Sequence, residues 1–281
     1  MSVKLRLKAI TGLIGELNSE AIIATYGMSQ VGKTTLWLQM LYDISDQTGK
    51  PALAYDCEGG MQEFVKQWDA KFKKLYPKAQ VDVRVKRDYK GILKDHGLIV
   101  KVKYSGADAK SDAAKRNTSG KMALTLVDEI DSEIEKLVVE KKYCAIMYDS
   151  ITMPMKFFGS EQQNFPARSY AQTLWFQKML DLIDDHGTYI IANHHASKNP
   201  ANQYETEKMS GGGNVQYFCK VIIYIKKVEA KGARAYRWIK LARYFSKPPN
   251  EHETLVKLTD DGYIDVSEED KEADIVAAKK R

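Results

Sequence analysis

The sequence predicts an α/β protein with a mainly parallel sheet, helices on both faces and antiparallel hairpins at the end of the chain. Short apolar runs, typical of buried strands, alternate with longer segments of helical apolar spacing, and this order is typical of a parallel sheet. After residue 221 the helical segments stop and strand-like runs follow one another with turn residues between them, which predicts hairpins.

The composition excludes several classes of protein. No apolar run is long enough to span a membrane, and the N-terminus lacks the apolar core of a signal peptide. Cys57, Cys144 and Cys219 each lie in an apolar run, which favours reduced core residues and a cytoplasmic protein. The net charge of +6 permits an acidic partner such as DNA but does not require one.

Residues 27–35 read Gly-Met-Ser-Gln-Val-Gly-Lys-Thr-Thr and match the phosphate-loop pattern Gly-x-x-x-x-Gly-Lys-[Ser/Thr]. Residues 21–26 before the loop read as a buried strand, and a helical segment follows that Gly49 can end. A strand, a glycine loop and a helix N-terminus gather backbone N–H groups around an anion. Lys33 would reach the β- and γ-phosphates, and the Thr34 hydroxyl would ligate Mg²⁺. We therefore expect ATP and Mg²⁺ as cofactors, bound by Gly27, Met28, Ser29, Gln30, Val31, Gly32, Lys33, Thr34 and Thr35.

Two later strands end in carboxylates. Residues 51–56 form a strand followed by Cys57-Glu58-Gly59-Gly60, where a carboxylate can orient an attacking water or simply form a turn. Both interpretations stay open, with Glu58 the first candidate for the catalytic carboxylate and Asp56 the second. The strand 144–150 carries Asp149 near its end, the Walker B pattern, and Asp149 would hold Mg²⁺ opposite Thr34.

The remaining segments predict the scaffold. Helices are expected at 61–76, 122–140 and 170–186, and strands at 81–85, 98–102, 188–195, 221–225, 235–245 and 255–258. A surface loop is expected at 105–121, within a basic insertion (77–121) that is either solvated or part of a DNA path. Residues 1–20 are either an edge strand or a basic arm. Adjacent histidines on a strand point to opposite faces, so His194 and His195 predict no metal site.

The order of these motifs resembles that of the RecA/RadA recombinases over roughly residues 10–266. The matching pieces are Gly27–Thr35, Tyr55–Gly59, Tyr148–Ser150, Ala192–His194, Gly211–Gly213 and the closing hairpins from Val221 to Val266. The resemblance implies a RecA-like P-loop ATPase domain in residues 1–266, followed by a charged tail (267–281). In contrast to the family, we expect no N-terminal helical DNA-binding domain, and the sequence contains no convincing Phe-x-x-Ala polymerisation motif. The chain therefore looks like a compact single-domain member, similar to RadB or to phage recombinases.

The resemblance also implies residue roles. Glu58 falls at the position of the water-activating glutamate, and His194 falls where the family senses the γ-phosphate, usually with glutamine. Loops 153–169 and 196–213 fall where the family binds DNA, with Lys156, Phe157, Phe158 and Arg168 in the first and Lys198, Tyr204 and Lys208 in the second. Lys240 and Arg243 are the candidates for a cation that reaches the ATP site of a neighbouring subunit.

The function expected from the resemblance is Mg²⁺-dependent ATP hydrolysis by a protein that binds single-stranded DNA in recombination, repair or phage and viral replication. A homo-oligomer, either filament or ring, is expected, with other recombination or replication proteins as further partners and no membrane. Two alternatives stay open: a ring-shaped DNA helicase, and an ATP-gated mediator that hydrolyses slowly.

Overall fold

The computed structural model describes residues 2–18, 22–86, 88–96, 112–151, 165–198, 207–209, 217–219, 221–228, 236–243 and 253–267. Its helices are α1 (Lys8–Ile14), α2 (Lys33–Thr48), α3 (Met61–Leu75), α4 (Tyr89–Asp95), α5 (Asp112–Lys141) and α7 (Phe165–His186). Its strands are β1 (Ser2–Val3), β2 (Leu17–Asn18), β3 (Ile22–Gly27), β4 (Ala52–Asp56), β5 (Val81–Val85), β6 (Ala145–Asp149), β7 (Tyr189–Lys198), β8 (Glu207–Met209), β9 (Val221–Lys227), β10 (Tyr236–Arg243), β11 (Glu253–Thr259) and β12 (Gly262–Asp265).

One sheet of ten strands runs through the molecule in the order β12-β11-β10-β9-β3-β7-β6-β4-β5, with β8 paired to the far end of β7. The strands from β9 to β5 in this order are mutually parallel, and β10, β11 and β12 join them as antiparallel hairpins. This confirms the predicted fold class. The strand β9 was expected to open the antiparallel part, but it pairs in parallel with β3, and the sheet changes direction only at β10.

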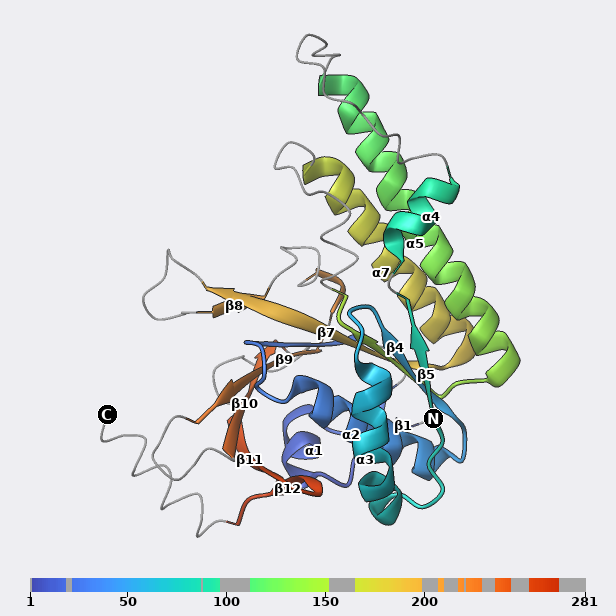
Figure 1. Cartoon of the computed structure of the whole chain (residues 1–281). Coiled ribbons are helices and arrows are strands. Elements are labelled where there is room, and N and C mark those ends of the chain that lie inside the picture. Colours follow the sequence, from blue (N-terminus) through green and yellow to red (C-terminus); the bar gives the residue numbers. More distant parts are fainter. Residues whose placement is uncertain are drawn as a thin grey trace.

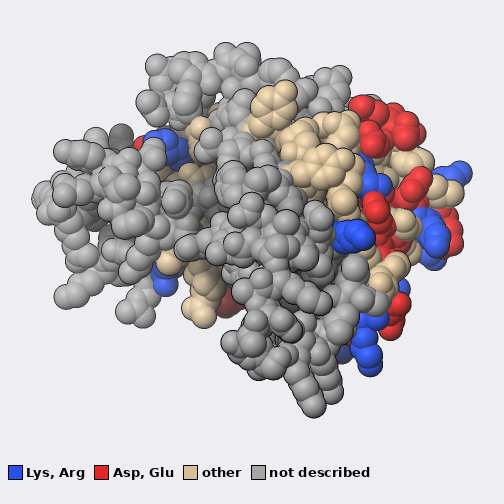
Figure 2. Space-filling view, turned by 90° about the horizontal axis from the view of Figure 1, so that it is seen from above, with Lys and Arg blue, Asp and Glu red and all other residues tan. Residues whose placement is uncertain are grey.

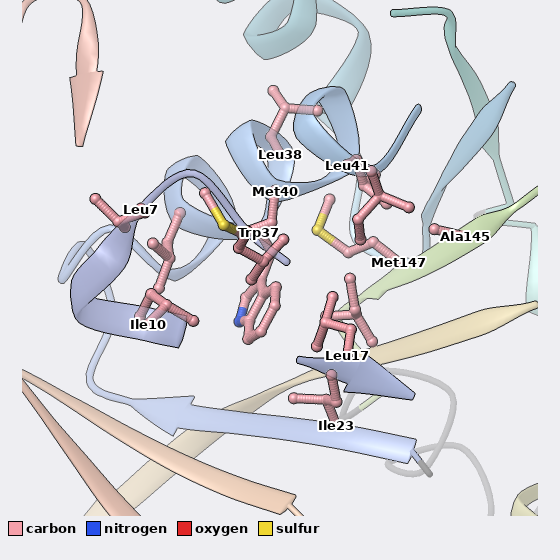
Figure 3. Packing of buried hydrophobic residues seen from close by; sticks show 14 of the residues in the cluster. Leu7, Ile10, Leu17, Ile23, Trp37, Leu38, Met40, Leu41, Ala145 and Met147 are labelled. Carbon is pink, nitrogen blue, oxygen red and sulfur yellow. The ribbon is translucent and has the colours of Figure 1, made fainter. Parts of the chain in front are cut away.

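Helices cover both faces of the sheet, as Figure 1 shows: α1, α2 and α3 lie on one face, and α5 and α7 pack together on the other. Each face has its own apolar cluster. Figure 3 shows Trp37 of α2 pointing among Ile10 of α1, Leu17 of β2 and Ile23 of β3. Trp37 is fully buried, and its indole N–H donates to the Thr25 hydroxyl at 2.5 Å. Trp37 thus fixes α2, the helix that follows the phosphate loop, against the sheet.

Two helices begin earlier than the sequence predicted. The helix α5 begins at Asp112, inside the segment expected to be a surface loop, and α7 begins at Phe165 inside the expected first DNA loop. The loop was expected because residues 105–121 are rich in Ala, Gly, Ser, Asp and Lys, but Ala and Lys favour a helix, and Ser, Asp or Gly costs it only a fraction of a kilocalorie to about 1 kcal/mol each. Extending an existing helix is cheap once its packed part has formed. The buried residues of α5 from Leu126 onward supply that packed part.

Other differences lie at the edges of the sheet. The strand β7 continues to Lys198 and pairs with β8, so part of the expected loop 196–213 is a hairpin. Residues 1–20 were expected to be an edge strand or a basic arm. The described part of this segment, residues 2–18, contains the short pair β1–β2 and the helix α1, with Val3, Leu5 and Leu7 buried. The strand expected at 98–102 lies outside the described residues.

Candidate functional site

The phosphate-loop segment lies where β3 meets α2. Its backbone takes left-handed φ angles at Gln30 (63°) and Gly32 (98°), and the side chains of Ser29 and Gln30 are exposed. Lys33 is 8% exposed, and its ammonium group donates to the carbonyl oxygens of Gly27 at 2.8 Å and Met28 at 2.9 Å. The loop therefore curves around the lysine that the sequence assigned to the phosphates.

Two glycines of the motif are required by distant parts of the chain. A Cβ on Gly27 would lie 2.4 Å from the carbonyl oxygen of Ile225 in β9. A Cβ on Gly32 would lie 2.2 Å from the hydroxyl of Tyr263 in β12, and its φ of 98° is itself unfavourable for a side chain. The C-terminal strands thus press directly against the phosphate loop.

Thr34 and Asp149 meet at this edge, as the motif predicted. The Thr34 hydroxyl donates to Asp149 Oδ2 at 2.7 Å, and the Asn193 amide donates to Oδ1 at 3.2 Å. Burial raises the pKa of Asp149, as do the negative charges of Glu58 and Asp56, while the hydrogen bonds from Thr34 and Asn193 act in the opposite direction. A divalent cation bound here would offset the electrostatic repulsion between these carboxylates.

The chemistry of these groups fits Mg²⁺. A hydroxyl and a carboxylate are hard oxygen ligands, and Mg²⁺ in nucleotide sites is held by one or two such groups together with the phosphates. Among the described residues there is no group of three or more His, Cys, Asp and Glu side chains that could hold a metal ion alone. Thr34 and Asp149 supply two such oxygen groups, so the site suits a metal ion that binds together with the phosphates.

Asp56 and Glu58 have separate roles, although the sequence left both interpretations open. Asp56 is 2% exposed and lies in register with Asp149 on the neighbouring strand. Its Oδ1 accepts from the backbone N–H of Glu58 at 3.0 Å and of Gly59 at 2.5 Å, and its Oδ2 accepts from that of Met61 at 2.9 Å. Asp56 thus forms the turn and holds the start of α3.

Glu58 presents its carboxylate to the site instead. Its side chain is 34% exposed, and Oε1 accepts from the Ser150 hydroxyl and lies 2.5 Å from Nε2 of His195. The Cα of His195 is paired with that of Gly27. Glu58 is therefore within reach of the phosphate loop, on the side of the sheet that carries Asn193 and Asp149.

The two histidines of β7 lie on opposite faces. Asn193 contacts Asp149, and His195 contacts Glu58, because residues two apart on a strand share a face. His194 points the other way and is fully buried, with its Cα opposite Tyr26 of β3. The structure thus brings His195 to the site and not His194. The alternation of side chains along a strand could have identified His195, because it places His195 on the same face as Asn193. The resemblance instead matched the family motif to the adjacent pair Asn193-His194.

Lys240 and Arg243 do not meet the phosphate loop of their own chain. The strand β10 begins opposite Lys227 at the carboxyl edge of β9 and runs away from that edge, so Arg243 is paired with Ile222 near the start of β9. The residue of β10 that reaches the loop is Arg237, whose Nε donates to the Val31 carbonyl at 2.6 Å. Arg237 and Tyr263 were not selected from the sequence, because nothing local marks them.

The expected DNA loops lie largely outside the described residues, as does most of the tail. Figure 2 shows one face of the molecule, on which described Lys and Arg side chains are interspersed with Asp and Glu. The charges of these described residues therefore do not by themselves define a path for nucleic acid on this face. No described helix has the length and apolar character needed to cross a membrane.

The strand order explains how the site is assembled. The strand β7 lies between β3, which leads into the phosphate loop, and β6, which ends in Asp149. The polar residues near the end of β7 therefore lie next to both the phosphate loop and Asp149. A parallel sheet with the nucleotide motif, two acidic strand ends and an intervening polar strand end at one edge defines a RecA-like P-loop fold.

Comparison with solved structures supports this fold. The chain is similar to the crystal structure of the RadB recombinase, with a TM-score of 0.55 and 16% sequence identity over 92% of this chain and 97% of that one. No protein-family model and no curated protein matches the sequence. The likeness is therefore one of fold, and it extends over most of the chain.

Proposed function

We propose that this chain is a Mg²⁺-dependent ATPase of the RecA-like kind that acts on single-stranded DNA. The observation that carries the proposal is the 2.7 Å contact between Thr34 and Asp149, with Lys33 and Glu58 at the same sheet edge. These four side chains come from three separate strand ends. A hydroxyl, two carboxylates and an ammonium group at one sheet edge are the groups that binding of a metal and a phosphate requires.

Each residue has a role in this proposal. Lys33 and the backbone of the loop bind the β- and γ-phosphates, while Thr34 and Asp149 hold Mg²⁺. The metal, when bound, neutralises charge on the phosphate oxygens. Glu58 orients a water molecule and accepts its proton, and Ser150 and His195 hold the carboxylate in place. His195, rather than His194, is then the histidine that responds to the nucleotide.

The second part of the proposal is that the protein binds single-stranded DNA. It is supported by the recombinase-like fold and by the order of the sequence, in which segment 153–169 comes after β6 and segment 196–213 begins within the last residues of β7. Sequence-independent binding needs cationic and aromatic side chains, which both loops contain. We expect Lys198→Ala combined with Lys208→Ala to weaken DNA binding and to reduce its dependence on salt.

One experiment tests both parts. ATP turnover is measured with and without single-stranded DNA for the wild type, Lys33→Ala and Asp149→Asn, and the same samples are imaged by electron microscopy. We expect turnover in the wild type that DNA stimulates and that both variants lose. Turnover that persists in both variants would refute the assignment of the site. Unwinding of a forked duplex would favour a helicase, and binding to a recombinase without stimulation would favour a mediator.

A further inference from the structure

Two buried side chains of the C-terminal strands form hydrogen bonds to the phosphate loop. Arg237 of β10 is 6% exposed, and its Nε donates to the carbonyl oxygen of Val31 at 2.6 Å. Tyr263 of β12 is 2% exposed, and its hydroxyl lies 3.2 Å from the carbonyl oxygen of Gly32 and 3.4 Å from that of Val31. Two consecutive carbonyl groups of the loop are thus hydrogen-bonded by side chains of the C-terminal strands, and that of Gly32 also accepts from the backbone N–H of Leu36 in α2 at 3.0 Å.

Tyr263 is itself fixed at both ends. Its backbone N–H donates to Oε1 of Gln39 at 2.6 Å, and its carbonyl accepts from Nε2 of Gln39 at 2.9 Å. Gln39 is 3% exposed and belongs to α2, the helix that the loop leads into. The hydroxyl therefore has little freedom to follow the loop if the loop moves.

The hydroxyl also remains a donor under all ordinary conditions. Burial raises the pKa of Tyr263 to about 12, against the opposing effect of the Arg237 charge and hydrogen bond. The guanidinium group is permanently charged. Together they place a positive charge and a protonated hydroxyl against the loop carbonyls at Val31 and Gly32, where Gly32 has the left-handed φ of 98°.

We propose that Arg237 and Tyr263 are positioning residues for nucleotide binding, which hold the phosphate loop in its binding conformation through the carbonyls of Val31 and Gly32. The proposal rests on the function proposed above. Fixing the carbonyls fixes the adjoining N–H groups, which a phosphate requires. A loop that samples other conformations binds its ligand more weakly in proportion to the time it spends in them.

The test compares Tyr263 with Tyr76, a second buried tyrosine that also forms a hydrogen bond with Gln39. Tyr263→Phe removes the hydroxyl at the loop but keeps the ring, whereas Tyr76→Phe removes a hydroxyl that accepts from Gln39 Nε2 at 3.2 Å. Affinity for Mg·ADP is measured by calorimetry, with the midpoint of thermal unfolding measured alongside. Amide hydrogen exchange over residues 27–35 is measured without nucleotide.

We expect Tyr263→Phe to weaken Mg·ADP binding about fivefold, the effect of one hydrogen bond, and to accelerate exchange of the loop amides. Arg237→Lys, which keeps the charge but not the planar donor group, should show a larger loss. Tyr76→Phe should change neither quantity, even if both tyrosine variants unfold at similar temperatures.

Equal affinities and equal exchange in Tyr263→Phe and Tyr76→Phe would overturn the positioning role, while leaving the nucleotide site intact. The proposed function fails in a different way. In that case the wild type would not bind Mg·ADP, or Lys33→Ala would bind it as well as the wild type does, and the positioning role would fall with it.

Discussion

Asp56 and Glu58 are two residues apart, and the structure predicts opposite consequences for their substitution. Glu58→Gln keeps the size of a side chain that is 34% exposed, and the amide oxygen can still accept from Ser150. We expect its effect on the free energy of unfolding to stay within about 0.5 kcal/mol. A positioned general base contributes about 10²–10⁴-fold, so turnover should fall by that factor while nucleotide affinity is kept.

Asp56→Ala should act through the fold instead. It leaves the backbone N–H groups of Glu58, Gly59 and Met61 without the carboxylate that accepts from them. Leaving a buried donor unsatisfied costs about 1–3 kcal/mol, and water can reach part of this turn, so we expect a loss of about 3 kcal/mol in unfolding free energy. Turnover falls as well, because the turn that carries Glu58 is lost.

The assay pairs chemical denaturation with single-turnover hydrolysis of ATP and with Mg·ADP affinity. Glu58→Asp, which keeps the charge but shortens the side chain, is the control for placement of the carboxylate. Full turnover in Glu58→Gln would refute its role as a base. A stable Asp56→Ala protein with slow turnover would show that Asp56, and not Glu58, is the catalytic carboxylate.

Three further predictions concern other parts of the chain. Glu133 of α5 forms ion pairs with Arg84 and Lys86. Burial alone would raise the pKa of Glu133, but these two basic side chains outweigh burial and lower it. The stabilisation is therefore present above the unfolded pKa of about 4.3 and is lost as the pH falls through the lower pKa of the folded protein. The stability difference between wild type and Glu133→Gln, about 1 kcal/mol in denaturation at pH 7, should therefore shrink as the pH falls below about 4, and a difference that does not change with pH would contradict a stabilising role of these ion pairs. Gly27→Ala must displace the backbone of β9 at Ile225, which should cost about 1–3 kcal/mol in denaturant unfolding, and an unchanged midpoint would argue against this close approach. Subunits carrying Arg243→Ala mixed with Lys33→Ala subunits should recover ATP turnover if Arg243 acts in trans, and co-assembly without recovery would remove that role.

The sequence by itself determined the parts of the site that depend on neighbours along the chain. The phosphate loop requires a strand, two glycines, a lysine and a hydroxyl in fixed order, and residues 27–35 supply all of these. The buried strands β4, β6 and β7 were visible because a strand covered on both faces reads as an unbroken apolar run. Their polar ends then had to meet at one edge, because parallel strands place their carboxyl ends together.

Only the tertiary structure decided which side chains serve that site. Asp56 and Glu58 look alike in the sequence, and the direction in which each carboxylate points depends on hydrogen bonds made after the turn has formed. His195 was distinguished from His194 by the face of β7 that turned toward Glu58. Tyr263 lies more than two hundred residues from the loop it contacts, and no local pattern encodes that contact, because the packing of β12 against α2 is settled by the sheet as a whole.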